Sequence, residues 1–212
     1  MLPYQEPLPL VWQKQAFDYV VSLFLLVFTA PLILLVVLLM IVEHCLRGHP
    51  LDPIFYSEKR ISRGTPFKLY KFNIFDQRVV DTYRRQNKFI HTKDLEINGE
   101  LIFIGKILKQ IYIDELPQLY NVLKGEMSLV GPRPLNLEVF EQAKTSGIPP
   151  QALILGGMTG SFQSLKDTRG LSALTLESDY LRKYALGGWS IVYVDVKIIL
   201  RTLMVLLRAK GV

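Results

Sequence analysis

Cysteine is almost absent from this sequence, since Cys45 is the single one among 212 residues. A lone cysteine cannot form a disulfide within the chain, which excludes the disulfide-stapled secreted folds and fits a reducing cytoplasm. The sequence also lacks long repeats and low-complexity tracts, which excludes solenoids and extended disordered arms. What remains is a chain long enough for one ordinary domain and one appended element.

Charge is missing from residues 19–42, a run of 24 residues built mainly from Leu, Val, Ile and Phe. A helix of that length reaches ~36 Å, more than the ~30 Å hydrocarbon core of a bilayer. The alternative is a cleaved signal peptide, but the run exceeds the usual apolar region of one and has no clear small-residue cleavage site. We therefore expect residues 1–45 to form a lead-in and a membrane-embedded helix, and residues 46–212 to form a second, water-facing domain.

Pro31 lies near the middle of the uncharged run. Proline removes a backbone hydrogen bond and clashes with the preceding turn, so we expect the helix to kink or break there. A kinked helix that crosses the membrane and a re-entrant helix that returns to its own side both fit this pattern. Periodicity does not choose between them.

Positive charge gathers directly after the uncharged run. The chain has a net charge of +6, and residues 43–91 hold ten Lys and Arg against five Asp and Glu. Basic residues beside a membrane segment favour the cytoplasmic side and bind anionic lipid headgroups. Nucleic acid would explain the charge alone but not the apolar run, and no recognisable module interleaves the basic residues with stacking aromatics. Membrane lipids are therefore the expected partner, and nucleic acid is not.

The remaining patterns predict an α+β, mostly helical domain. We expect a short hairpin over residues 54–72, a loop or exposed helix over 76–100, and a short strand over 101–105. A helix should follow Asp114 and end at Gly125. We expect further helices over residues 135–145, 171–185 and 191–208. The domain also contains a turn at 131–134 and a glycine-rich loop at 156–160. In the last of these helices, Lys197, Arg201 and Arg208 lie within about 40° of one another on a helical wheel. This predicts an amphipathic helix at the membrane surface, with a core helix as the alternative.

The residues that carry chemistry lie between Gly105 and Pro134. Asp114 and Glu115 are adjacent carboxylates, Lys109 precedes them, and Arg133 sits in a Gly-Pro-Arg-Pro turn. Asp114 is also a good helix N-cap, so a purely structural role accounts for it equally well. Two carboxylates with fixed cations beside a membrane suit a phosphate-bearing substrate and a divalent metal. The loop at 156–160 could also bring backbone N–H groups close to phosphate.

Three segments in this order resemble one family of bacterial enzymes. They are Pro66–Phe72, Asp114–Leu119 and Asn121–Pro134. On these segments the chain resembles the small monotopic phosphoglycosyl transferases, the bacterial sugar transferase family that starts glycan assembly on undecaprenyl phosphate. The resemblance extends from Lys14 almost to the C-terminus. It implies transfer of a sugar-1-phosphate from a UDP-sugar to undecaprenyl phosphate with release of UMP, as the first membrane step of O-antigen, capsule, exopolysaccharide or glycoprotein assembly.

The resemblance also implies roles for individual residues. Asp114 would be the nucleophile that carries a covalent phosphosugar, and Glu115 would hold Mg²⁺. Arg133 and Lys109 would position substrate phosphate, together with two lysines of the first segment, Lys68 and Lys71. Asp179 is similar to a later acidic residue of the family. Family members carry a re-entrant helix broken at a Ser-Pro pair on the cytoplasmic face of the inner membrane, and here Ala30 stands before Pro31.

Several positions depart from the family pattern. Asn73–Phe75 replaces Arg-Thr-Met, Leu155–Gly157 replaces Arg-Pro-Gly, and Ser161–Gln163 replaces Trp-Ala-Gln. Two cations near the nucleotide are thereby lost, which bears on the donor more than on the reaction. The alternative is a catalytically degenerate membrane scaffold that binds lipid-linked glycan substrates. The sugar, the pathway and the oligomeric state, a homodimer included, are left open.

Overall fold

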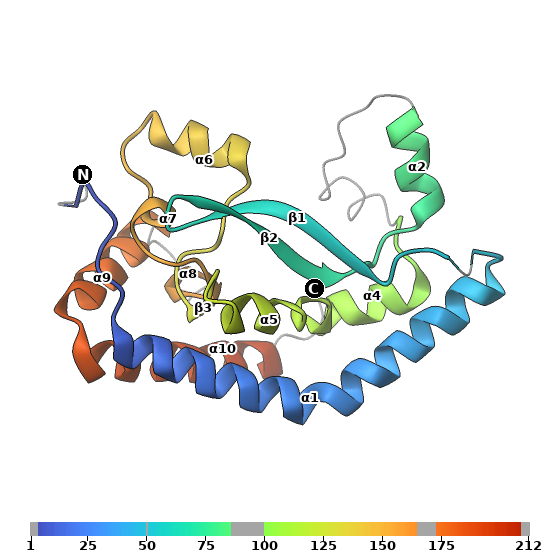
Figure 1. Cartoon of the computed structure of the whole chain (residues 1–212), viewed down its shortest axis with the longest axis horizontal. Helices are drawn as coiled ribbons and strands as arrows, with labels where there is room; N and C mark the ends of the chain where they lie inside the picture. Colours follow the sequence, from blue (N-terminus) through green and yellow to red (C-terminus); the bar gives the residue numbers. More distant parts are fainter. Residues whose placement is uncertain (1–3, 50, 86–99, 165–172, 209–212) are drawn as a thin grey trace. The chain divides into compact units, whose positions relative to one another are not determined.

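The structure is a computed structural model that describes residues 4–49, 51–85, 100–164 and 173–208. The fold is α+β and mostly helical, as expected (Figure 1). In chain order its elements are α1 (Trp12–Leu46), β1 (Phe55–Ser62), β2 (Thr65–Phe72), α2 (Gln77–Arg85), α4 (Phe103–Gln110), the 3-10 turn η1 (Ile113–Glu115), α5 (Gln118–Leu123), β3 (Ser128–Val130), α6 (Leu137–Lys144), α7 (Pro150–Leu153), β4 (Gly157–Thr159), α8 (Ser161–Ser164), α9 (Ala173–Leu186) and α10 (Gly188–Arg208).

The chain divides into two compact units. The described part of the first unit comprises residues 4–27, 58–69, 118–164 and 173–208. The described part of the second unit comprises residues 28–49, 51–57, 70–85 and 100–117.

Helix α1 contains the whole uncharged run. It continues through Pro31 without interruption, so the break that we allowed for at this proline does not occur. Its length and hydropathy suffice to cross a membrane, and only 11% of its most apolar 18-residue window is buried. A soluble core helix would bury this surface, so α1 has the character of a membrane helix.

The predicted hairpin is confirmed as β1 and β2. The connection between the strands is short, because only Arg63 and Gly64 lie outside them. Both residues have positive φ, at 48° and 75°. Two central residues with positive φ form the turn whose twist matches a two-residue hairpin.

The core of the second unit packs apolar side chains of α1 and α4 against the residues around the end of β2. Its buried members are Val36, Met40, Phe72, Ile74, Phe75, Val80, Ile102 and Leu108. The strand expected over 101–105 is wrong, since Leu101 forms only a single antiparallel bridge with Phe75 and α4 begins at Phe103. The carboxylate of Glu43 accepts hydrogen bonds from the backbone N–H groups of Phe103 and Ile104, at 2.7 and 2.9 Å. This tertiary cap satisfies the free amides that open the helix.

The helix expected directly after Asp114 is also corrected. Asp114 lies inside η1, and α5 begins only at Gln118, so Asp114 is not a helix N-cap. An α-helix would need the N–H of residue 117 to bond the carbonyl of Ile113, and Pro117 has none. The N–H of Leu116 donates to the Ile113 carbonyl instead, at 3.1 Å, which closes a 3-10 turn.

The other helical predictions are confirmed by α2, α6, α9 and α10. Asn136 caps α6 through its side chain, which accepts the Val139 N–H at 2.8 Å. Residues 86–99 of the expected loop and the side chain of Arg208 lie outside the described residues. In the first unit, β3 and β4 pair in parallel, with Ser128 opposite Gly157 and Val130 opposite Thr159.

Candidate functional site

The two adjacent carboxylates lie in a short turn of the second unit. Tyr112 precedes η1 with φ 57° and ψ 20°, the left-handed conformation that a tyrosine adopts only at a cost of ~1–3 kcal/mol. Asp114 is buried, with 6% of its surface exposed, and Glu115 is partly buried. A strained turn that holds one carboxylate away from water is typical of a functional position.

Lys71 supplies a cation to this turn. Its Nζ lies 3.1 Å from Oε1 of Glu115, and the two side chains are 18% and 19% exposed. The end of β2 fixes Lys71, because the neighbouring Phe72 is buried in the core of the unit. The structure therefore brings together two of the predicted site residues, Lys71 and Glu115.

Helix α4 leads into the same turn and carries Lys109, which is partly buried in its last turn. The helix packs closely against the chain at Ile74, since a Cβ added at Gly105 would lie 2.5 Å from the Ile74 carbonyl oxygen. This close approach explains a glycine at the start of the segment from Gly105 to Pro134. Lys109 and the two carboxylates thus belong to one unit with a closely packed support.

Charged contacts also hold the end of α1 in the second unit. Arg47 bonds Glu43 at 3.3 Å and also pairs with Asp76. Burial by itself would raise the pKa of Asp76, but hydrogen bonds from Arg78 and the charges of Arg47 and Arg78 hold that pKa below its usual value. Glu43 bonds both Arg47 and the start of α4, so the end of α1 is tied to the helix that leads into the carboxylate turn.

The carboxylates suit a magnesium ion that is completed by a substrate. In the part of the chain that the structure describes, no three His, Cys, Asp or Glu side chains gather into a metal cage. Mg²⁺ keeps several waters and is usually held by one or two carboxylates together with substrate phosphates. The pair formed by Asp114 and Glu115 matches that donor set.

Arg133 belongs to the first unit, in the turn that follows β3. Glycines let this turn approach β4, because a Cβ added at Gly131 would lie 2.5 Å from the Leu155 carbonyl oxygen and one at Gly157 would lie 2.1 Å from the Gly131 nitrogen. The side chain of Gln151 donates to the Arg133 carbonyl at 3.1 Å. The backbone is thereby fixed, while the side chain of Arg133 is exposed.

The glycine-rich segment at 156–160 does not present its first amides to a phosphate. The N–H of Gly156 donates to Ser62 Oγ at 2.9 Å, and that of Gly157 donates to the Pro132 carbonyl at 2.9 Å. Both donors are used within the unit, so the phosphate interpretation is wrong for these two groups. The glycines allow close packing instead.

Of the remaining predicted site residues, Lys68 and Asp179 belong to the first unit and Pro31 belongs to the second. Lys68 is exposed on β2, and its carbonyl accepts from Asn121 Nδ2 at 2.7 Å. Asp179 pairs with Lys183 at 2.6 Å on the exposed side of α9. Pro31 is exposed on α1.

The sequence analysis missed a buried polar cluster in the first unit. Lys14 Nζ lies 2.5 Å from Asp195 Oδ2 and 3.6 Å from Asp18 Oδ2. Tyr180 donates its hydroxyl to Asp195 at 2.7 Å. Burial raises the pKa of Asp195 to about 6, although the charge of Lys14 and the hydrogen bonds from Lys14 and Tyr180 oppose that rise. The available signal was Asp195 itself, the one acidic residue in a mostly apolar helix.

This cluster holds the strand that leads to Arg133. Asp18 accepts from Ser128 Oγ at 2.6 Å and from the Leu129 N–H at 3.2 Å. The single hydroxyl proton of Tyr180 is shared, since the Val130 carbonyl oxygen lies 3.1 Å from the same hydroxyl. Every residue of β3 is thus bonded to side chains of α1 or α9, and the turn with Arg133 starts at the next residue.

Comparison with known proteins gives a consistent result. The model of the bacterial sugar transferase family matches residues 10–209. An uncharacterized sugar transferase of Bacillus subtilis is 32% identical over 206 residues, which cover 94% of this chain and 89% of that protein. An undecaprenyl-phosphate galactose phosphotransferase of Salmonella typhimurium is 29% identical over 93% of this chain and 41% of its own length. An undecaprenyl-phosphate glucose phosphotransferase of Komagataeibacter xylinus is 31% identical over 90% of this chain and 35% of its own length.

Proposed function

The chain belongs to the bacterial sugar transferase family and is a transferase, and from that premise we propose that it moves a sugar-1-phosphate from a UDP-sugar to undecaprenyl phosphate and releases UMP. Two relatives that cover at least nine-tenths of the chain are named as phosphotransferases acting on undecaprenyl phosphate. Such a transfer would be the first membrane step in the assembly of a bacterial glycan.

One observation carries the proposal: the adjacent carboxylates of Asp114 and Glu115 lie in a strained turn with Lys71 against Glu115. Asp114 is buried, with 6% of its surface exposed, so bulk water reaches little of this carboxylate. Lys71 offsets negative charge in a place where carboxylates must meet a diphosphate.

The proposed reaction has two displacements at one phosphorus atom. A carboxylate oxygen of Asp114 attacks the β-phosphorus, the bond to the bridging oxygen breaks, and UMP leaves with that oxygen. An oxygen of undecaprenyl phosphate then attacks the same phosphorus, and the bond to Asp114 breaks. The products are undecaprenyl diphosphate sugar and the free carboxylate. Splitting the transfer in this way replaces one difficult step by two easier ones.

Glu115 is the residue that we assign to Mg²⁺, which when bound neutralises charge on the phosphate oxygens. Lys71 then keeps Glu115 oriented and shares the negative charge of the turn. We assign Lys109, Lys68 and Arg133 to phosphate groups of the substrates. Arg133 suits this role because its guanidinium can bond two phosphate oxygens at once.

We also propose that α1 is kinked at Pro31 and re-entrant in the inner membrane, with the rest of the described chain on the cytoplasmic face. Near the start of α1, Asp18 bonds Ser128 and Leu129 of the first unit. At its end, Glu43 bonds the start of α4 in the second unit. Both partners follow α1 in the chain, and the described residues contain no second helix that could span a membrane. If α1 crossed the bilayer, its start would lie on the side opposite to Ser128, so these contacts favour a helix that returns to its own side.

The test is release of UMP from a panel of UDP-sugars by the full chain in membranes that contain undecaprenyl phosphate. We expect at least one UDP-sugar to release UMP, and Asp114→Asn to lower turnover by at least roughly a thousandfold because a carboxamide is a poor nucleophile. Asp52→Asn, which also removes one partly buried carboxylate of the second unit, is the matched control and should keep the wild-type rate.

Two results would contradict the proposal. Turnover by Asp114→Asn at the rate of the Asp52→Asn control would remove Asp114 from the reaction. If no UDP-sugar releases UMP, the catalytically degenerate scaffold becomes the better account.

A further inference from the structure

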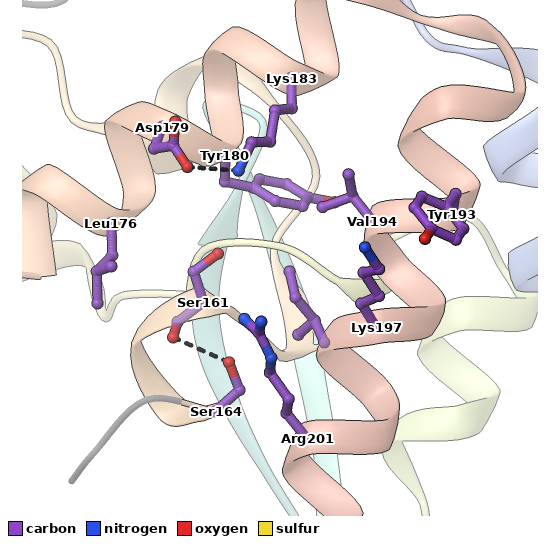
Figure 2. A pocket seen from close by; sticks show the side chains of 11 residues that line it. Ser161, Ser164, Leu176, Asp179, Tyr180, Lys183, Tyr193, Val194, Lys197 and Arg201 are labelled. Atoms are coloured by element: carbon purple, nitrogen blue, oxygen red, sulfur yellow. Dashed lines mark hydrogen bonds and ion pairs between the residues drawn. The ribbon is translucent and has the colours of Figure 1, made fainter. Parts of the chain in front are cut away.

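A pocket of about 300 Å³ opens in the first unit between α8, α9 and α10 (Figure 2). Lys197 and Arg201 extend from α10 toward this space, and Ser161 of α8 faces them. Lys183 and Asp179 of α9 line it as well. None of these residues has a role in the reaction proposed above, and Asp179 is the one among them that the family resemblance pointed to.

The pocket has an excess of positive charge. Asp179 is the one acidic residue among its described lining residues, and it is paired with Lys183 at 2.6 Å. That pair leaves Lys197 and Arg201 without a carboxylate among the residues that line the pocket. Lys197 is held with its ammonium 4.2 Å from the centre of the Tyr193 ring, a contact that orients the cation without neutralising it.

Lys197 and Arg201 also repel each other. They are spaced four residues apart on α10, so their side chains lie on neighbouring turns of the same face, where like charges destabilise a helix by roughly 0.2–0.5 kcal/mol. An anion between them removes that repulsion and gains two charge-assisted hydrogen-bonding partners. Two neighbouring cations that line a pocket of this size therefore favour a compact anion.

The face of α10 beside the pocket is apolar and exposed. Its members are Trp189, Tyr193, Val196, Leu200 and Leu203, which are 65%, 61%, 37%, 54% and 49% exposed. On a helix with 3.6 residues per turn this stripe is centred about 100° from the two cations. Trp12 packs edge-on against Trp189 with ring centroids 6.2 Å apart, so two exposed indoles adjoin the stripe. Tryptophan and an apolar face flanked by cations are typical of a helix at the level of lipid headgroups.

We propose that this pocket binds a phosphate group, held by the guanidinium of Arg201 and the ammonium of Lys197. The apolar stripe on the same helix favours a lipid headgroup as the source of that phosphate, and a small soluble phosphate is the other source. The proposal does not depend on the reaction assigned to Asp114.

The test compares lipid binding by three forms of the full chain in detergent micelles. They are the wild type, Lys197→Gln/Arg201→Gln, and the control Lys144→Gln/Arg182→Gln, which loses the same charge from exposed residues of α6 and α9 outside the pocket. The probes are phosphatidic acid, phosphatidylcholine and inorganic phosphate, with bound lipid counted by native mass spectrometry and phosphate binding followed by calorimetry.

We expect phosphatidic acid to bind the wild type and the control alike, and to bind the pocket variant at least roughly tenfold more weakly, since two charge-assisted contacts are lost. Phosphatidylcholine, whose choline offsets the phosphate charge, should not distinguish the three forms. Binding of inorganic phosphate that is lost in the pocket variant alone, without a difference for phosphatidic acid, would support the site and assign a soluble source.

Equal binding of every probe by the pocket variant and the control would overturn the proposal. If the pocket variant does not fold, amide hydrogen exchange in the wild type alone tests the proposal. Phosphatidic acid or inorganic phosphate should slow amide hydrogen exchange in α8 and around Lys197, relative to chloride and phosphatidylcholine. If neither ligand slows exchange there, the pocket does not bind phosphate.

Discussion

The contact between Lys71 and Glu115 is the feature of the site that a single substitution probes best. Both side chains are about four-fifths shielded from solvent, so their attraction is screened less than that of a surface pair. Removing the lysine leaves Glu115 in a partly buried place with a neighbouring carboxylate one residue away. The charge balance of the turn then has to come from the metal ion.

Lys71→Gln should therefore lower UMP release by about tenfold or more and lower the Mg²⁺ concentration needed for half the maximal rate, since the cation that competes with Mg²⁺ for Glu115 is gone. The physical reason is that a favourable charge at the diphosphate is lost while the geometry of β2 is kept. The rate of UMP release measured as a function of Mg²⁺ concentration gives both the maximal rate and the half-maximal concentration. Lys59→Gln removes an exposed cation from β1 and should leave the titration curve as in the wild type. An unchanged curve in Lys71→Gln would show that Lys71 has no part in the reaction.

Glu177 of α9 gives a prediction about stability and pH. Burial raises the pKa of Glu177 from 4.5 to about 7. Between these values the folded chain holds more protons than the unfolded chain, so the free energy of unfolding falls as pH rises from about 4.5 to about 7. Glu177→Gln removes the ionisable group and should raise the melting temperature at pH 8 while leaving it nearly unchanged at pH 4.

Thermal unfolding of the full chain in detergent at both pH values tests this directly. Glu141→Gln, on the exposed side of α6, is the matched control and should retain the pH dependence of the wild type. The same dependence in Glu177→Gln would mean that Glu177 does not titrate in this range.

At the scale of elements, the buried cluster of Lys14, Asp18, Tyr180 and Asp195 ties α1, α9 and α10 to β3. Buried ion pairs contribute little net stability compared with apolar residues of the same size, but breaking one of them leaves an uncompensated charge. The main effect of the cluster is therefore to determine which segments pack together, and its net contribution to the free energy of unfolding is small.

Lys14→Met should accordingly destabilise the chain by about 3 kcal/mol, because two buried carboxylates lose their cation. Adding Asp195→Leu should recover part of that loss, which makes the two substitutions non-additive. Melting temperatures of the two single variants and the double variant give the coupling. The exposed pair of Lys144 and Glu141, 3.1 Å apart, should show a coupling below about 1 kcal/mol. Additive losses for Lys14 and Asp195 would refute the proposed linkage.

Elements whose turn or capping residues are close to them in the sequence could be predicted from the sequence. The hairpin has its own turn residues, and α6 has its own N-cap in Asn136. The start of α4 was not predictable, because its cap comes from Glu43, 60 residues away in the chain. The 3-10 turn at Asp114 depends on the missing N–H of Pro117, a signal that was present but read as an ordinary helix start.

The residues of the candidate site also divide into those with a local signature in the sequence and those without one. Asp114, Glu115 and Lys71 could be named from motifs, and in the structure Lys71 contacts Glu115. Lys14 and Asp18 are four residues apart in the sequence, but their partners Ser128 and Asp195 are more than one hundred residues away. Such contacts are set by packing and carry no local signature.

At the scale of the whole molecule, the topology of α1 decides how the protein lies in the membrane. From contacts near the two ends of α1 we proposed that both ends lie on the same side of the membrane as the chain that follows the helix. The exposed Cys45 at one end and a Gln5→Cys substitution at the other allow each end to be labelled separately, the second in a Cys45→Ser background.

A membrane-impermeant maleimide added to intact spheroplasts should label neither cysteine, and both should react after the membrane is permeabilised. The expectation follows from a re-entrant helix with both ends in the cytoplasm. An engineered periplasmic cysteine in an unrelated membrane protein is the control for reagent access. Labelling of position 5 but not of Cys45 in intact spheroplasts would show that α1 spans the bilayer.

The most direct test of the central claim is the mass of the peptide that contains Asp114 after the full chain is mixed with a reactive UDP-sugar and Mg²⁺ but no undecaprenyl phosphate. The account predicts a sugar-phosphate adduct on Asp114 that disappears when undecaprenyl phosphate is added and never forms in Asp114→Asn. Release of UMP by a chain whose Asp114 stays unmodified at every time of quenching would contradict it.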